Sequence, residues 1–278
     1  MVPTDGHQGP VTYSMRNGKL IMRQRHTVKS KKGRTVASMT QHTRISNLIM
    51  NWRTFKGGLC DCFETKKLGA TDDSGFMSIN SRTARVYLTQ EQVQRHCSVA
   101  DNFVVSSGTL PYPVQVHETD TQMVSDILVG NMPQGLDCPM MVFTAALRQM
   151  NPGRIQTGDI LCFVRLTQHY NAQEGVPQSR CKVTRLTVGT EVHLTAHQAI
   201  ESVGDTDGFS IVEGQLAAER RDDSLVAWII LRPVREHQVL ATTQHLVGTN
   251  STLPSFSSEE ARQAAVHSYG PLEQQLTE

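Results

Sequence analysis

The sequence predicts an α+β protein with a mostly antiparallel, sandwich-like β body, a few helices, and an N-terminal basic β-hairpin plus amphipathic helix. Three observations predict this class. An Asn-Gly pair separates two alternating segments near the N-terminus, and apolar residues recur at helical spacing within residues 36–55. From about residue 86 onward, short runs rich in Val, Ile and Thr alternate with turn residues. A chain of 278 residues is long enough to bury a substantial core.

The hairpin is predicted over residues 11–25. Asn17-Gly18 suits a type I′ turn, in which both central residues take a positive φ, and a two-residue loop pairs Arg16 with Lys19. Alternation then gives two unlike faces. The apolar face holds Val11, Tyr13, Met15, Leu20 and Met22, and the other face holds Thr12, Ser14, Arg16, Lys19, Ile21, Arg23 and Arg25. An isolated ribbon is marginal in water, so we expect the apolar face to dock on another surface.

Two helices are expected next. After a basic linker over residues 26–35, apolar residues from Ile45 to Phe55, with Trp52 among them, indicate an amphipathic helix over residues 36–55 that ends at Gly57-Gly58. A shorter helix is expected over residues 73–84, with Asp73 or Ser74 as its cap.

The rest of the chain is predicted to be rich in strands. Three helices are expected to interrupt or follow them: 120–129, started by Asp120; 139–150, with Pro139 in its first turn; and 258–268, with Ser257 and Glu260 as a capping box. The expected strands lie near residues 102–107, 113–118, 159–168, 181–188, 190–195, 209–217, 225–232 and 238–246.

Charge divides the chain into two predicted regions. Residues 1–67 carry 13 Lys or Arg against 3 acids, a net +10, whereas residues 68–278 carry 14 against 23, a net −9. We therefore expect a basic hairpin–linker–helix arm over 1–67 and an acidic, strand-rich body with a short C-terminal helix over 68–278. The arm is predicted to bind a partner or phosphate through Arg16, Lys19, Arg23, Arg25, Lys29, Lys31, Lys32 and Arg34, and to dock through Tyr13, Met15, Leu20, Met22 and Trp52.

Catalytic motifs are missing from the sequence. It contains no G-x-S-x-G elbow, phosphate-binding loop, G-x-G-x-x-G or H-E-x-x-H segment. We expect no catalytic residues, no cofactor and a non-enzymatic function. Pairs of acids such as Asp72-Asp73 and Asp222-Asp223 and the Gly158-Asp159 step are interpreted as turn residues.

No metal site is predicted. Cys60 and Cys62 are separated by one residue, closer than the usual spacing in structural zinc sites, and buried free thiols are the competing explanation. His193 and His197 are expected on a strand, where residues four apart lie ~13 Å from each other.

Six cysteines in a chain of this length do not indicate a disulfide framework. No apolar run reaches the ~18 residues that a membrane helix needs, and the N-terminus has no signal-peptide pattern. We therefore expect cytoplasmic synthesis and no membrane partner.

The partner of the arm has three interpretations. The first is the acidic body of a neighbouring copy, which makes the chain a homo-oligomer or a subunit among other structural subunits. The second is nucleic acid, bound without sequence preference, since only Asn17 and Gln24 offer planar base contacts. The third is a ribbon docked on its own body with its cations in solvent. The first is our leading hypothesis.

The pattern Val11-x-Tyr13-x-x-Arg16-Asn17-Gly18-Lys19-x-x-x-Arg23 resembles an uncharacterised domain family of bacteria, their mobile elements and phages. The segments 104–111, 151–168, 224–233 and 240–246 resemble segments of that family in the same order, whereas the cysteine-rich segment 59–63 departs from its pattern. The resemblance implies no established activity. It favours a mobile-element or virion setting, in which basic arms link subunits.

Overall fold

The fold was analysed in a computed structural model of the chain. It describes residues 6–8, 11–16, 19–24, 35–64, 71–132, 137–189, 210–235 and 238–269, and in the first three ranges side chains are described only for residues 20–23. The expected α+β class, rich in mostly antiparallel strands, is confirmed.

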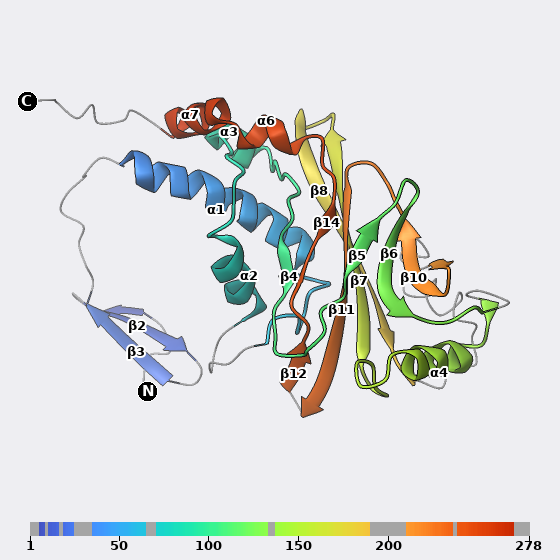
Figure 1. Cartoon of the computed structure of the whole chain (residues 1–278). Coiled ribbons are helices and arrows are strands. Elements are labelled where there is room, and N and C mark those ends of the chain that lie inside the picture. The colour runs from blue at the N-terminus through green and yellow to red at the C-terminus, as the bar shows by residue number, and fades with distance from the viewer. Residues whose placement is uncertain are drawn as a thin grey trace, which may run out of the picture.

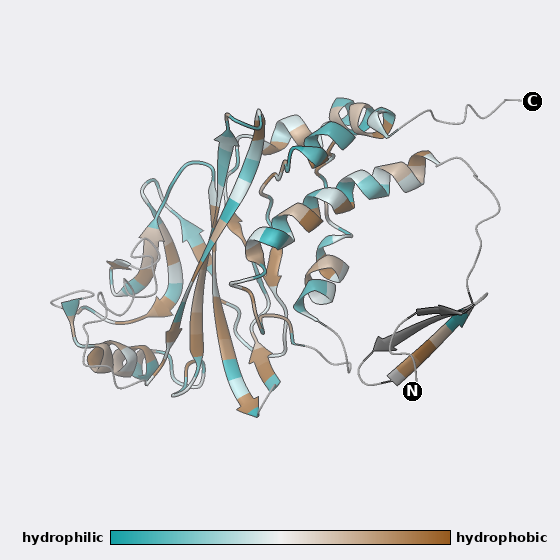
Figure 2. Ribbon diagram, turned by 180° about the vertical axis from the view of Figure 1, so that it is seen from behind, coloured by the Kyte–Doolittle hydropathy of each residue, from teal (hydrophilic) through white to brown (hydrophobic). Residues whose placement is uncertain are grey.

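A five-stranded antiparallel sheet forms the centre of the body (Figure 1). Its strands are β7 (Ile160–Asn171), β8 (Val176–Thr187), β11 (Ser224–Arg235) and β12 (Gln238–Ala241), in the order β12-β11-β7-β8, with β14 (Val247–Gly248) also paired to β11. β11 is buried on both faces over its first eight residues, which explains its nearly continuous apolar run. Figure 2 shows the brown, hydrophobic colour along these central strands.

One face of the central sheet packs against a smaller sheet. That sheet has the order β5-β6-β10-β9 and consists of β5 (Val116–Glu118), β6 (Gln122–Leu128), β10 (Gln215–Glu219) and β9 (Ser210–Val212). Together with α4 (Met140–Met150) it encloses a core that includes Phe143, Phe163 and Trp228. The expected sandwich is this pair of sheets.

Helices and extended segments cover the opposite face. α1 (Val36–Phe55) and α2 (Asp72–Asn80) pack there with the two-stranded pair of β4 (Val104–Ser106) and β13 (Gln244–His245). Short α3 (Gln90–Gln94), α6 (Leu253–Ser257) and α7 (Glu259–Ser268) lie beside α1, on the side away from α2 (Figure 1). The layers of the body are therefore helices, central sheet, and small sheet with α4.

The packing of α1 changes the expected division of the chain. Leu48, Trp52 and Phe55 are buried in the same core as central-sheet residues such as Val164 and Ile229. Because α1 belongs to this core, a boundary at residue 67 does not separate two packing units. The N-terminal part of the chain forms a separate three-stranded sheet of β1 (Gly6–Gln8), β2 (Val11–Arg16) and β3 (Lys19–Gln24).

The prediction of a helix over residues 120–129 is wrong, because this segment contains strand β6. The segment pairs with β5 on one side and with β10 on the other, and these ladders prevail over the helix signal at Asp120. Thr119 Oγ1 accepts from the Gln122 backbone N–H at 3.0 Å, so the turn signal belongs to the β5–β6 connection.

Two caps also differ from expectation. Thr71, rather than Asp73 or Ser74, caps α2, and that helix ends at Asn80. Ser258 caps α7 by accepting from the Ala261 N–H at 3.1 Å, because Ser257 already belongs to α6. The expected strand 190–195 lies outside the described residues.

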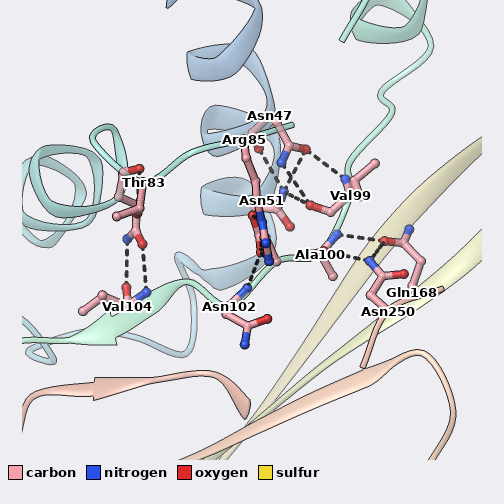
Figure 3. A network of polar contacts seen from close by, with 12 residues as sticks. Asn47, Asn51, Thr83, Arg85, Val99, Ala100, Asn102, Val104, Gln168 and Asn250 are labelled. Atoms are coloured by element: carbon pink, nitrogen blue, oxygen red, sulfur yellow. Dashed lines mark hydrogen bonds and ion pairs between the residues drawn. The ribbon is translucent and has the colours of Figure 1, made fainter. Parts of the chain in front are cut away.

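An extended segment over residues 98–104 crosses the helical side of the sheet. Side-chain amides form hydrogen bonds with many of its backbone N–H and carbonyl groups (Figure 3). Asn47 donates to the Val99 carbonyl at 3.0 Å and accepts from the Val99 N–H at 2.9 Å. Gln168 accepts from the Ala100 N–H at 2.8 Å and donates to the Ser98 carbonyl at 3.0 Å. Asn80 binds both backbone groups of Val104 in the same way. We call these three contacts the amide clamps.

Candidate functional site

Two surfaces of the described chain have the character of binding sites, the arm sheet and a cationic pocket on the body. In the arm sheet the register pairs Arg16 with Lys19, Thr12 with Arg23, Met15 with Leu20 and Tyr13 with Met22. This register confirms the expected pairing of the hairpin. β1 adds a third strand on β2, which the sequence did not indicate.

Three of the four described side chains of the arm sheet are open to solvent. Leu20 is 39% exposed and Met22 is 65% exposed, and Arg23 is exposed as well. None of the four described side chains in this sheet, residues 20–23, belongs to a core cluster. Of the other predicted binding residues, Arg25, Lys29, Lys31, Lys32 and Arg34 lie outside the described residues.

Trp52 has a different environment from the other predicted docking residues. It is buried on α1 and packs against Phe76, with ring centroids 5.2 Å apart, and against Phe63 at 6.3 Å. Trp52 therefore anchors α1 to the body.

The cationic pocket lies at the β8 edge of the central sheet and has a volume of about 560 Å³. β7 contributes Arg165, Thr167 and His169, and β8 contributes the consecutive residues from Ser179 to Lys182. Thr54 of α1 and Arg221, from the turn between β10 and β11, complete the lining. Among the described residues that line it, four are Lys or Arg and none is acidic.

The strand register brings the cations of the pocket together. Arg165 lies directly opposite Lys182 in the β7–β8 ladder, and Thr167 lies opposite Arg180. Residues two apart on a strand share a face, so Arg165, Thr167 and His169 line up beside Arg180 and Lys182.

Arg165 is the buried member of the pocket, only 2% exposed. Its guanidinium donates to the Glu219 carbonyl at 2.9 Å and lies over the Phe163 ring, 5.5 Å from the centroid. Arg221 is held by the Glu219 carboxylate at 3.0 Å. Arg180 and Lys182 are exposed on the strand.

Sequence reasoning missed this pocket. A signal was present, because R-x-T-x-H over 165–169 and R-x-K over 180–182 both alternate with strand period. The facing register of the two strands, which brings the alternating cations together, becomes visible only in the fold.

The cysteine-rich segment forms a corner between α1 and α2. The Cys60 thiol and the Asp61 and Asp72 carboxylates offer ligand atoms within 4.8 Å of one another. Asp72 also accepts from the backbone N–H groups of Asp61, at 3.0 Å, and of Phe63, at 3.2 Å, so its carboxylate fixes this turn. These bonds give the Asp72 carboxylate a structural role, and burial raises the pKa of Asp72.

The buried thiols near this corner form a pair. Cys62 and Cys162 are both fully buried, and their thiols hydrogen bond each other. This bond, together with burial, raises the pKa of Cys62 well above its usual value. The Arg185 guanidinium donates to the Cys60 carbonyl and lies 3.9 Å from the Cys62 sulfur. All six cysteines are free thiols.

Two other acids singled out by sequence, Asp159 and Asp223, have structural partners. Asp159 is 2% exposed and forms a two-point ion pair with Arg232 at 2.7 and 2.8 Å. Asp223 Oδ1 accepts from the Ser251 N–H at 2.6 Å. His193 and His197 lie outside the described residues. Among the described helices, none has both the length and the apolar character needed to cross a bilayer.

Comparison with protein-family models, with curated proteins and with solved structures found no match for this chain. The resemblance drawn from the N-terminal pattern therefore stays a prediction.

Proposed function

We propose that this chain is a non-enzymatic structural protein that self-assembles through its N-terminal arm sheet, with the body of a neighbouring copy as the partner. The observation that carries this proposal is the exposed apolar side of the arm sheet at Leu20 and Met22. A small sheet gains stability by covering its apolar face.

The two faces of the arm sheet favour a protein partner over nucleic acid. Phosphate would neutralise the face that contains Arg16, Lys19 and Arg23 but would leave the apolar face in water. A copy of this chain offers apolar surface together with a net charge of −9 over residues 68–278. One such partner would cover the apolar face of the arm sheet and neutralise its cationic face.

The arm has the reach for such a contact. Ten residues separate Gln24 from Thr35, and ten residues span at most about 35 Å. Exchange of a tethered element between identical copies is an economical route to oligomers. A phage particle is the setting that the N-terminal resemblance favours.

The proposal is tested by the native mass of the full chain, measured by light scattering at low and high salt. Wild-type protein should form oligomers, and the variant with Arg16, Lys19, Arg23 and Arg25 all changed to Glu should be monomeric with an unchanged circular dichroism spectrum. A control variant makes the same charge change at four exposed residues of the body. It replaces by Glu the residues Arg53, Lys56, Arg82 and Arg235.

A second pair of variants isolates the apolar face. Met22→Asp should weaken assembly, whereas Met141→Asp, at a residue that is 60% exposed on α4, should not. A monomeric wild type, or assembly unchanged in both arm variants, would refute the proposal. Co-purified nucleic acid, seen as a raised 260/280 absorbance ratio that falls with salt, would instead favour nucleic-acid binding by the arm.

A further inference from the structure

We infer that a third surface, the groove beside Tyr112, binds a neutral saccharide and is separate from the arm sheet and from assembly. The groove lies where the connection between β4 and β5 meets β6 and the turn between α4 and β7. Its described lining consists of Tyr112, Pro113, Gln115, Asp126, Asn151, Pro152, Gly153 and Arg154. The inference rests on the strain and exposure of Tyr112, on the contacts that hold its loop, and on the charge balance of the lining.

Tyr112 combines an unfavourable backbone conformation with an exposed ring. Its φ of +64° lies in the left-handed region, where a bulky side chain crowds the backbone. Pro113 restricts the backbone of the residue before it further. The ring gains little burial in return, because Tyr112 is 66% exposed. Backbone strain of this kind is concentrated at binding and catalytic sites, so the position of Tyr112 calls for a ligand.

The loop that carries Tyr112 is held by an ion pair beneath it. The Arg154 guanidinium donates to the Pro113 carbonyl at 3.1 Å and to Asp126 Oδ1 at 2.8 Å. The same carboxylate oxygen accepts from the Gln115 N–H at 3.1 Å. Because these contacts hold the loop, less of its conformational freedom remains to be lost when a ligand binds.

The charges of the lining cancel. Asp126 and Arg154 are the charged residues among the described residues of the groove, and they pair with each other. A groove without net charge offers little Coulomb attraction to a phosphate or to a cation. Polar capacity nevertheless remains, because Asp126 Oδ2 and the exposed Gln115 amide form no hydrogen bond within the described chain. The groove therefore suits a ligand that is polar but uncharged.

A saccharide matches both the polar and the apolar part of this lining. Sugar hydroxyls donate and accept hydrogen bonds without net charge, and the C–H groups of a sugar ring form an apolar face that packs on the negative face of an aromatic ring. Tyr112, Pro113 and Pro152 supply a stiff apolar wall beside the free polar groups of Asp126 and Gln115. The volume of about 660 Å³ lies within the range of small-molecule sites.

A proline-rich peptide is the competing ligand. Such peptides dock in grooves lined by aromatic side chains. Tyr112 is the one aromatic residue among the described residues of this groove, which favours stacking on a single sugar ring.

Chance exposure of a tyrosine is the remaining explanation, since single exposed apolar side chains are common. Tyr170 on β7 is such a residue, because it is 70% exposed and has no positive φ. It is the matched control for Tyr112.

The test is saturation-transfer NMR of the full chain with four neutral trisaccharides, namely maltotriose, cellotriose, mannotriose and fully N-acetylated chitotriose. At least one sugar should show transfer, and Tyr112→Ala should lower its affinity by about tenfold or more. Gln115→Ala, at an exposed side chain, should lower the affinity by about threefold. Tyr170→Ala should leave it unchanged. Absence of transfer from all four sugars, or equal affinity in Tyr112→Ala and wild type, would overturn the inference.

A glycine variant separates a binding role of Tyr112 from a structural one. Glycine takes a φ of +64° without strain, so Tyr112→Gly should lose the sugar affinity while its Tm stays at or above that of wild type. A fall in Tm that accompanies the loss of affinity would instead show that the ring supports the loop, and the inference would fail.

Two further measurements separate this site from assembly and from peptide binding. The arm variant with four charges reversed should bind the sugar as wild type does, whether or not it assembles. Binding of decaproline that depends on Tyr112, without binding of any sugar, would overturn the inference and assign the groove to a peptide.

Discussion

Replacing Asn47 by Ala tests whether the amide clamps stabilise the fold. Asn47 is 2% exposed and Val99 is 0% exposed, so water cannot replace the bonds that are lost. The Val99 carbonyl keeps a second donor in Asn51 Nδ2, at 3.1 Å, but the Val99 N–H, which binds Asn47 Oδ1 at 2.9 Å, is left without this acceptor. A buried, unsatisfied donor costs about 1–3 kcal/mol, and the lost bonds add about 1 kcal/mol.

We therefore expect Asn47→Ala to lower the free energy of unfolding by about 2–3 kcal/mol, measured by urea denaturation. For a protein of this size that corresponds to a fall in Tm of roughly 4 to 12 °C. Asn102→Ala is the matched control, because Asn102 lies on the same segment with its side chain exposed (Figure 3). A loss below about 0.5 kcal/mol for Asn47→Ala, or equal losses for the two variants, would refute the reasoning.

Three further predictions follow from the buried ion pair, a tight turn and a pocket thiol. Arg232→Met should lower the unfolding free energy by about 3 kcal/mol, because it leaves the Asp159 carboxylate buried without its ion-pair partner. Arg95→Met is the control: it removes an exposed ion pair with Glu91 and should lower the unfolding free energy by less than about 0.5 kcal/mol. Equal losses of stability in the two variants would contradict this account. Gly214→Ala should lower the unfolding free energy by about 1–2 kcal/mol, since Gly214 has a φ of +78° and the new Cβ would lie 3.3 Å from the Gly130 backbone. Gly57→Ala is the control, because nothing lies within 4 Å of its new Cβ. A similar shift in Tm for both variants would argue against a strained turn. Burial raises the pKa of Cys181 to about 12, so the thiolate is scarce at neutral pH. The rate of alkylation at Cys181, measured by peptide mass spectrometry, should therefore keep rising above pH 9. A rate that levels off near pH 9 would show an ordinary thiol.

The elements with the strongest local signals were predictable from the sequence. α1 was expected over residues 36–55 and occupies Val36–Phe55, because its apolar spacing and the glycines after it point the same way. β11 was expected over residues 225–232 from its apolar run, and the structure shows that its first eight residues are buried. The hairpin register followed from the length of its loop.

Elements that depend on distant partners were not predictable. Residues 122–128 form a strand only because β5 and β10 pair with them. The clamp residues Asn47, Asn80 and Gln168 are ordinary polar residues in sequence, and their role arises from a backbone segment that reaches them from far along the chain. The cationic pocket needed the β7–β8 register in the same way.

The amide clamps make this fold sensitive to chemical ageing of side chains, to which the backbone hydrogen bonds between two strands are not sensitive. Backbone pairs in a sheet are not altered by hydrolysis of a side chain, whereas Asn and Gln are thermolabile residues. Deamidation of Asn47 or Asn80 would replace a nitrogen that donates to a carbonyl by an oxygen that repels it. Burial of both residues shields the amides while the body stays closed. Ageing of the protein should therefore be governed by how often the helical layer opens, and damage at one clamp should make the next opening easier.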